Sequence, residues 1–285
     1  MMNAETRRKV VTVVSNIILA IVLAAIAVLV IYPLFYMVAT SLKDYNTYIS
    51  NPFGIDFSNL KFSNYTEVMQ ANNILPAVVN SAVLSVVSVF LMVLWAAMAS
   101  FGIGVVKFKG AGLIYFIAVS TMFFTGEMVY IPLYLMYWKL NLLNTFWVLV
   151  IPYVVGLSGL GVIMGSGFIR QIPGEIHEAA FLDGAGLSHL FFRIDLPMLK
   201  PILAMVAIMQ FQSTWSEFFW PLITVIGNRE VYTLPLLLIG FRAQDATYYG
   251  QYCAGLTIMT VPIVLVYCFF SKYFMEGMAA GAVKG

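Results

Sequence analysis

Residues 176–201 read IHEAAFLDGAGLSHLFFRIDLPMLKP, and this stretch decides how the rest of the chain is interpreted. It forms the longest polar-rich interval in the second half of a chain that is otherwise close to lipid-like in composition. Acidic and basic residues gather in residues 170–200, which we call the handle. Such a cluster in an apolar chain predicts a segment that lies in water, where a second protein can bind and move it.

The composition of the chain predicts a membrane protein. Hydrophobic residues make up 61% of the 285 residues, charged residues make up only 10%, and the mean hydropathy is +0.91. Because a soluble globular chain carries about a quarter charged residues, this chain cannot cover a surface that faces water. The net charge of +2 is too small to suggest nucleic acid as a partner. Cys253 and Cys268 share one apolar run, which favours buried small residues over a disulfide or metal site.

Six apolar segments are long enough to cross a bilayer as helices, which takes roughly 20 residues each. The expected spans are about 15–38, 77–100, 112–136, 146–169, 202–225 and 250–273. Glu127 and Pro132 interrupt the third span, and Glu217 interrupts the fifth. The first apolar run is longer than the roughly 7–15 residues of a signal-peptide core, so we expect it to remain as a helix. We expect residues 1–285 to form a single domain.

The distribution of Lys and Arg predicts that both termini are cytoplasmic, because cytoplasmic loops carry the excess of these residues. With the N-terminus inside, ten of these residues fall on the inner side and five on the outer side, and the handle is cytoplasmic. The inner residues are Arg7, Arg8, Lys9, Lys107, Lys109, Arg170, Arg193, Lys200, Lys272 and Lys284. The outer residues are Lys43, Lys61, Lys139, Arg229 and Arg242.

The handle is expected to form a helix–turn–helix at the membrane surface. Pro173 suits the first turn of a helix, where Glu175 also meets the favourable end of the helix dipole. Gly184 is expected to end this helix in the left-handed conformation. Ser188 would then cap a second short helix that Pro197 ends. The alternative is an ordinary connecting loop that folds back on its own domain.

The handle contains Glu178-Ala179-Ala180, then Gly184, then Ile194 and Leu196-Pro197. This pattern resembles the cytoplasmic signature loop of ATP-binding cassette (ABC) importer permeases, and no position of it departs from the family. The letters EAAFLDGA resemble the carbohydrate branch in particular. Three further stretches agree with the resemblance: WSEFFWPL at 215–222, GMAAGAVKG at 277–285 and SLK at 41–43. The tail resembles that of the smaller permease in maltose-type importers, and Asn80-Ser81 also matches.

The resemblance implies an all-α membrane protein with the type I ABC importer permease fold, six transmembrane helices and a cytoplasmic helix–turn–helix coupling loop. It implies a non-catalytic, multi-pass subunit of a bacterial inner membrane that forms a heterodimer with a second permease. Two partner ATPase subunits would bind ATP and Mg, so this chain would hold no cofactor, metal or catalytic residue. An external solute-binding protein would deliver a sugar or oligosaccharide, with lipid as the surrounding medium and no nucleic acid involved.

The resemblance also assigns residues to the contact with the ATPase and to the contact with the binding protein. The residues expected to couple to the ATPase are Glu178, Ala179, Ala180, Asp183, Gly184 and Ala185. The residues expected to contact the binding protein are Phe241, Arg242, Gln244, Asp245 and Tyr248. The C-terminal tail would reach between the ATPase subunits. The alternatives are a plain external connector and a frayed terminus.

A solute pathway is expected near the carboxylates that lie within spans, because an intramembrane acid usually faces a cavity or a partner. Glu217 stands beside Trp215 and Trp220, and carboxylate and indole groups suit the hydroxyls and apolar faces of a sugar. Glu127 and Asn80 complete the expected pathway. The alternatives are an interfacial belt for the tryptophans and a structural tie to a neighbouring helix for Glu217.

The sequence assigns no function to its two histidines and suggests only a packing role for two glycines. His177 and His189 are expected at the surface, because no third ligand stands at metal spacing. Gly161 and Gly165 could let two spans pack closely.

Other functions also stay open: the same machinery could carry a glycerophosphodiester, a polyol or an acidic sugar. An ion-coupled carrier or a membrane enzyme would be a different class of protein.

Overall fold

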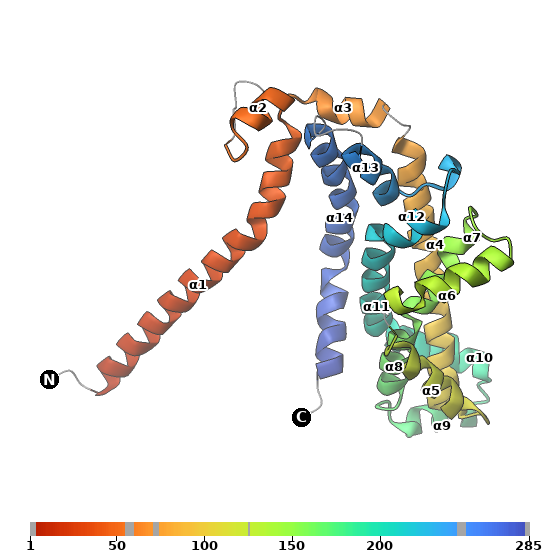
Figure 1. Ribbon diagram of the computed structural model, residues 1–285. Coiled ribbons are helices and arrows are strands. Elements are labelled where there is room, and N and C mark those ends of the chain that lie inside the picture. Colours follow the sequence, from red (N-terminus) through yellow and green to blue (C-terminus); the bar gives the residue numbers. More distant parts are fainter. Residues whose placement is uncertain (1–3, 55–59, 71–73, 125, 244–248, 283–285) are drawn as a thin grey trace. The chain divides into compact units, whose positions relative to one another are not determined.

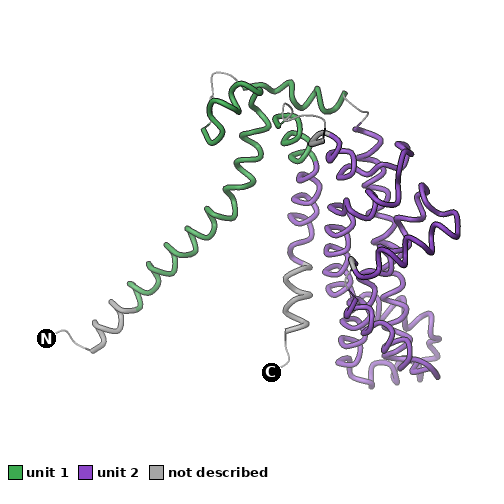
Figure 2. Tube along the Cα trace, in the orientation of Figure 1, with its two compact units in different colours: residues 1–72, 241–258 green, residues 73–240, 259–285 purple. Residues whose placement is uncertain are grey.

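The computed structural model describes residues 4–54, 60–70, 74–124, 126–243 and 249–282, and all regular elements in these ranges are helices (Figure 1). The chain divides into two compact units, residues 1–72 with 241–258 and residues 73–240 with 259–285 (Figure 2). Helix α14 (Tyr249–Ala282) contributes to both units. The single domain expected from the sequence stays a prediction.

Five stretches in the described part of the chain are long and apolar enough to cross a membrane. They are Thr12–Ser41, Ile74–Val106, Trp147–Ile169, Leu187–Ser216 and Tyr249–Lys272. Four of them overlap the first, second, fourth and sixth expected spans within a few residues at most ends. Uninterrupted apolar runs of this length leave helix as the only conformation that satisfies the backbone in lipid, which is why the sequence locates them well.

The third expected span, 112–136, is divided into two shorter helices. Helix α5 (Ala111–Thr121) ends ten residues into the span, and α6 (Gly126–Lys139) begins after a break. Gly126, at the start of α6, is among the poorest helix formers, whereas Pro132 lies inside α6 without ending it. Hydropathy does not reveal the break because both helices are apolar.

The fifth expected span, 202–225, begins earlier and ends earlier than the sequence suggests. Helical backbone runs through α10 (Leu187–His189), the π-helix η2 (Leu190–Asp195) and α11 (Leu196–Ser216). The expectation that Pro197 ends a helix is therefore wrong. Pro197 lies in the first turn of α11, where its missing N–H leaves no hydrogen bond broken. The N-cap of α10 is Gly186, two residues before the expected Ser188.

Unit 1 contains α1 (Ala4–Ser41), α2 (Tyr45–Ser50) and α3 (Ser63–Gln70). Buried Asn64 donates hydrogen bonds from Nδ2 to the carbonyl oxygens of Ser41 and Lys43, both at 2.8 Å. The Lys43 ammonium in turn donates to the carbonyl oxygens of Asn51 and Pro52 at 2.9 and 2.7 Å. The SLK stretch thus ties the end of α1 to the polar segment that follows it.

The core of unit 2 forms where α4 (Ile74–Phe101) packs against α8 (Ser158–Ile169) and α11. A Cβ added to Gly161 would lie 2.8 Å from the Cβ of Ala96, and one added to Gly165 would collide with Ser100. These two glycines of α8 therefore let α4 approach closely, which confirms the expectation from their spacing. Buried side chains of the cluster include Met92, Ala96, Val162, Leu199 and Val206.

A second apolar cluster in unit 2 forms around α7 (Trp147–Gly156) and the short helix α12 (Phe219–Thr224). It includes Leu84, Tyr137, Val148, Leu149 and Trp220, all with at most 2% of their surface exposed. The 3-10 turn η3 (Arg229–Val231) and helix α13 (Leu234–Ala243) follow α12. The helix α9 (Gly174–Leu182) and the π-helix η1 (Gly102–Val106) complete the elements of this unit.

Candidate coupling site

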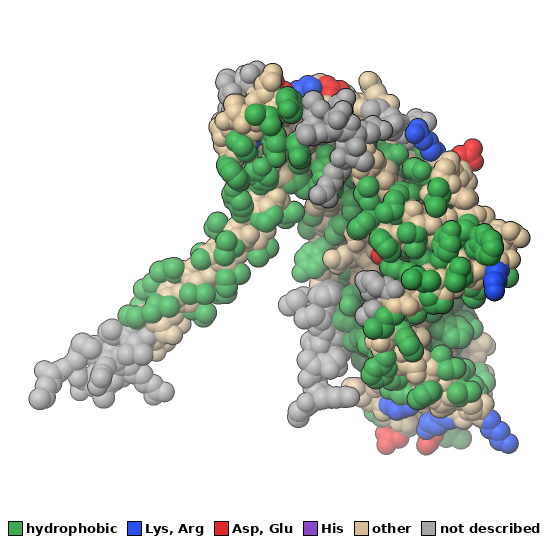
Figure 3. Space-filling model, in the orientation of Figure 1, with side chains coloured by type: hydrophobic (Ala, Val, Ile, Leu, Met, Phe, Trp, Pro, Cys, Tyr) green, Lys and Arg blue, Asp and Glu red, His purple; other side chains and the backbone are tan. Residues whose placement is uncertain are grey.

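The handle lies at the end of unit 2 where α8 ends and where η1 leads into α5 (Figure 1). Charged side chains gather at this end, whereas hydrophobic side chains cover most of the visible face above it (Figure 3). Exposed charged residues here include Lys107, Lys109, Arg170, Glu175, Glu178 and Asp183. This separation is what a bilayer demands of the part of a membrane protein that emerges into water.

Helix α9 ends as the sequence predicts. Gly184 has φ +80°, its N–H donates to the carbonyl of Phe181 at 3.0 Å, and the N–H of Ala185 donates to the carbonyl of Ala180 at 2.9 Å. These two bonds form a Schellman motif, in which the left-handed glycine lets the last helical carbonyls find donors. At the other end Glu175 lies in the first turn, as expected, while Pro173 is the N-cap, one position earlier than expected.

The expected coupling residues divide between an outer and an inner face of α9 and its turn. Glu178, Ala179, Asp183 and Gly184 are exposed, and Leu182 has 89% of its surface exposed. Ala180 and Ala185 are half-buried and pack against the core cluster of α4, α8 and α11. The handle thus presents a small-residue, acidic surface outward while two alanines fix it to unit 2. Binding of an ATPase to these residues stays a prediction.

His177 is not the surface residue that the sequence suggests. Its Nε2 lies 2.9 Å from Oδ1 of Asp195, and the side chains are 12% and 0% exposed. The pair joins α9 to η2 across 18 positions of the sequence. Sequence analysis missed it because the contact depends on the turn between the two elements. His189 is exposed, as expected.

Both tryptophans of the expected solute pathway are buried in unit 2. The Trp215 indole Nε1 donates to the carbonyl of Met259 at 2.9 Å, and the Trp220 indole donates to the carbonyl of Val148 at 2.9 Å. Their exposed fractions are 2% and 1%. Burial excludes an interfacial belt, which would leave the indoles at the lipid surface. Contact with a solute stays a prediction for both.

Glu217 has a structural role in addition to any role in the pathway. Its Oε1 accepts hydrogen bonds from the backbone N–H groups of Phe219 at 2.7 Å and Trp220 at 3.2 Å. These are donors of the first turn of α12, which have no partner within the helix, and the carboxylate also complements the positive end of its dipole. The structural tie that the sequence left open is therefore present, made to the next helix in the chain.

Asn80 ties α4 to the segment that follows α12. Its Nδ2 donates to the carbonyl oxygens of Glu230 and Tyr232 at 2.6 and 3.0 Å. The hydroxyl of its neighbour Ser81 accepts from the N–H of Leu234 at 2.8 Å. The Asn80-Ser81 pair thus positions the start of the loop that the sequence assigns to the binding protein. Gln244, Asp245 and Tyr248 of that loop lie outside the described residues, as do the side chains of Phe241, Arg242 and Glu127.

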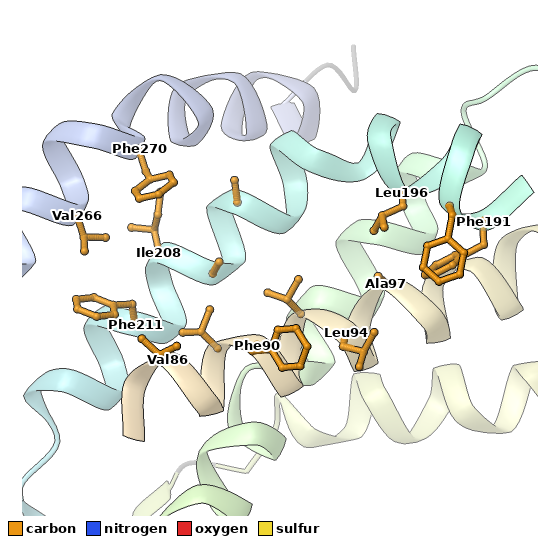
Figure 4. Close-up of a pocket in the computed structure, with 15 residues that line it drawn as sticks. Val86, Phe90, Leu94, Ala97, Phe191, Leu196, Ile208, Phe211, Val266 and Phe270 are labelled. Carbon is orange, nitrogen blue, oxygen red and sulfur yellow. The ribbon is translucent and has the colours of Figure 1, made fainter. Parts of the chain in front are cut away.

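A cavity of about 610 Å³ opens between α4, η2, α11 and α14 (Figure 4). All its lining residues are apolar, among them Phe90, Leu94, Ile208, Phe211 and Phe270. A sugar needs hydrogen-bond partners for its hydroxyls, so this cavity is unsuited to such a solute. The lining of the cavity is suited instead to apolar groups within the membrane.

The long apolar helices and the exposed, capped handle define a helical membrane protein with a charged, water-exposed segment at one end of unit 2. The chain is 32% identical to the probable ABC transporter permease protein YurM of Bacillus subtilis, with 89% of this chain and 84% of YurM covered. It is 30% identical to the arabinooligosaccharides transport system permease protein AraQ of Halalkalibacterium halodurans, with 94% and 96% covered. The chain therefore belongs to the family of ABC transporter permease proteins.

The fold agrees with this family. The structure matches a chain from the crystal structure of a bacterial ABC transporter involved in the import of the acidic polysaccharide alginate, with a TM-score of 0.79 and 19% sequence identity. The match covers 96% of this chain and 99% of that chain, which confirms the all-α permease fold expected from the sequence. No protein-family model matches the chain.

Proposed function

We propose that this chain is the non-catalytic permease subunit of an ATP-driven importer for a sugar or oligosaccharide. The observation that carries the proposal is the exposed handle: α9, closed by a Schellman turn at Gly184, presents Glu178, Ala179 and Asp183 outward at the charged end of unit 2. This surface, in a chain of the ABC permease family, fits a groove on a nucleotide-binding partner.

The proposed assembly contains three kinds of partner protein. A second homologous permease completes the pathway, two ATPase subunits bind ATP and Mg, and a solute-binding protein delivers the cargo from outside. The chain spans a bacterial inner membrane with both termini in the cytoplasm. The ten-to-five distribution of Lys and Arg supports this orientation, because it puts the handle on the side where ATP is available.

The names of relatives support an oligosaccharide as the cargo. They include permeases for arabinooligosaccharides, for diacetylchitobiose in Streptomyces coelicolor, and for melibiose, raffinose and stachyose in Bacillus subtilis. An acidic sugar is the second candidate, favoured by the structural match to an alginate importer.

Purification of the chain from its own membrane tests the proposal. We expect a stoichiometric ATPase, a second permease and a binding protein to accompany it. ATP hydrolysis by this complex, measured with arabino-oligosaccharides, diacetylchitobiose, raffinose and alginate oligosaccharides, should rise with one sugar class. A lone chain that transports a solute without ATP would overturn the proposal, and stimulation by alginate oligosaccharides alone would select the second candidate.

A further inference from the structure

The hydrogen bond between His177 and Asp195 crosses the most deformable part of the handle. The backbone from α9 to α10 passes through Gly184, Ala185 and Gly186, with φ +80° at Gly184 and an extended Gly186. An added Cβ would meet no atom within 4 Å at either glycine. Two glycines within three residues give this connection more conformational freedom than any other pair of residue types. The backbone alone is therefore a poor link between α9 and α11.

The hydrogen bond from His177 stabilises the buried side chain of Asp195. Its side chain is fully buried, and among the residues that the structure describes its second oxygen, Oδ2, has no hydrogen-bond partner. A buried carboxylate without a partner is costly, and a hydrogen bond to the charged group offsets part of that cost. When Asp195 is ionised its carboxylate can only accept, and Nε2–H of His177 is then the donor. His177 thus supplies the one hydrogen bond that the structure shows for this carboxylate.

The position of Asp195 connects the pair to the membrane helices. Asp195 is the last residue of η2 and directly precedes α11, which packs along α4 and α8 through the core of unit 2. Leu190 and Phe191 of the same π-helix are buried in that core. His177 directly precedes Glu178, the first of the exposed coupling residues. A displacement of α9 can therefore be transmitted to α11 through the contact between His177 and Asp195, which bypasses the glycine turn.

We propose that His177 and Asp195 are positioning residues that brace α9 against the start of α11. The brace makes the handle and α11 move together, so that displacement of the handle by its partner reaches the membrane helices instead of being lost in the turn. This inference rests on the proposed function, because it assumes that an ATPase moves the handle.

Hydrogen–deuterium exchange of the chain in its purified complex tests the brace without any transport measurement. We expect His177→Ala to speed exchange of the α9 amides by about tenfold while α8 and α11 amides keep their rates. His177→Gln keeps an N–H donor and should restore slow exchange. His189→Ala is the matched control, because His189 is exposed in the same segment. Unchanged α9 exchange in His177→Ala, or an equal effect of His189→Ala, would overturn the proposal.

The double variant His177→Ala/Asp195→Asn covers the case in which the single variant unfolds. It removes the buried charge together with the donor, so the fold should be retained while the brace stays absent. Fast α9 exchange in this variant supports the brace, and slow exchange overturns it.

A second measurement separates the brace from the proposed function. In proteoliposomes we expect the double variant to hydrolyse ATP while sugar uptake per ATP falls by about fivefold or more. A normal ratio would overturn the brace and leave the proposed function standing. If the wild-type complex contains no ATPase, the proposed function fails and the role of the brace in transport fails with it.

Discussion

The indole Nε1 of Trp220 donates a hydrogen bond to the carbonyl oxygen of Val148 at 2.9 Å, joining α12 to the first turn of α7. The Trp220 ring also stacks on Tyr130 with 5.4 Å between ring centroids. Together with the carboxylate of Glu217 at the start of α12, these contacts hold the chain in a bend directly after α11. The bend is therefore fixed by residues that lie 72 positions apart as well as by local ones.

Replacement of Trp220 by Ala should destabilise unit 2 by about 3–5 kcal/mol, because it removes a fully buried ring and leaves a cavity. Trp220→Phe keeps most of the ring but loses the donor to Val148, so it should cost about 1–2 kcal/mol. Thermal unfolding of the purified chain in detergent, followed by circular dichroism, measures both. Trp138→Ala is the control, since Trp138 is 59% exposed and should change the midpoint little. Equal effects at Trp138 and Trp220 would contradict this account.

The features that the sequence predicted are those set by residues close together in the chain. Apolar runs located the helices around residues 15–38, 77–100, 146–169 and 250–273, and Gly184 predicted the end of α9 by its conformational freedom alone. The breaks near Gly126 and Glu217 could not be predicted in the same way. Glu127 and Glu217 interrupt the two apolar runs, but a single acid does not show whether a helix ends there. The bend after α11 also depends on a hydrogen-bond partner in α7.

The same limit applies to the candidate site. The residues expected to couple to an ATPase follow a fixed local spacing, so the sequence places them together on one short helix and its turn. His177 looked like a surface residue because its partner Asp195 is brought to it by the fold of the turn and by the π-helix η2. Asn80 matched a motif, but its hydrogen bonds to the backbone at Glu230 and Tyr232 depend on a contact across 150 positions.

Gly184→Val should disrupt the handle while the membrane helices stay folded. A β-branched residue at φ +80° is strained by about 2 kcal/mol or more, so the Schellman turn should open and α9 should lose its last hydrogen bonds. Gly186→Ala lies two residues away at φ −80° with open space around it, and is the matched control. We expect Gly184→Val to reduce the amount of ATPase that co-purifies with the chain, and Gly186→Ala to retain most of it. Full retention in Gly184→Val would argue against the handle as the docking segment.

Acid should weaken the polar end of unit 1 through Glu67. Burial alone would raise the pKa of this carboxyl, but hydrogen bonds from Ser63, Gln251 and Lys61 outweigh it and lower the pKa below its ordinary value of 4.5. A carboxyl whose pKa is lowered by folding contributes stability above its unfolded pKa and loses it as the pH falls through the folded pKa. The effect should be small, because the side chain is 41% exposed and solvent screens it.

Hydrogen–deuterium exchange of α3 at pH values from about 6 to about 3, corrected for the intrinsic rate, measures this loss. We expect protection of α3 to fall below pH 4.5 in the wild-type chain. Glu67→Gln cannot ionise, so its protection should be lower at neutral pH and nearly independent of pH over this range. A wild-type profile that matches the Gln variant would show that the Glu67 carboxylate contributes nothing.

Gly161→Ala should separate α8 from α4, because the added Cβ would lie 2.8 Å from the Cβ of Ala96, which has no side-chain torsion to relieve the clash. Overpacking of this kind typically costs about 1–3 kcal/mol. Gly167→Ala on the same helix meets no atom within 4 Å, and it should be neutral or stabilise the helix by up to about 1 kcal/mol. The double variant Gly161→Ala/Ala96→Gly exchanges the two methyl positions and should recover part of the loss in thermal unfolding. If Gly161→Ala and Gly167→Ala unfold at the same temperature as the unchanged chain, the close approach of α8 and α4 does not limit stability.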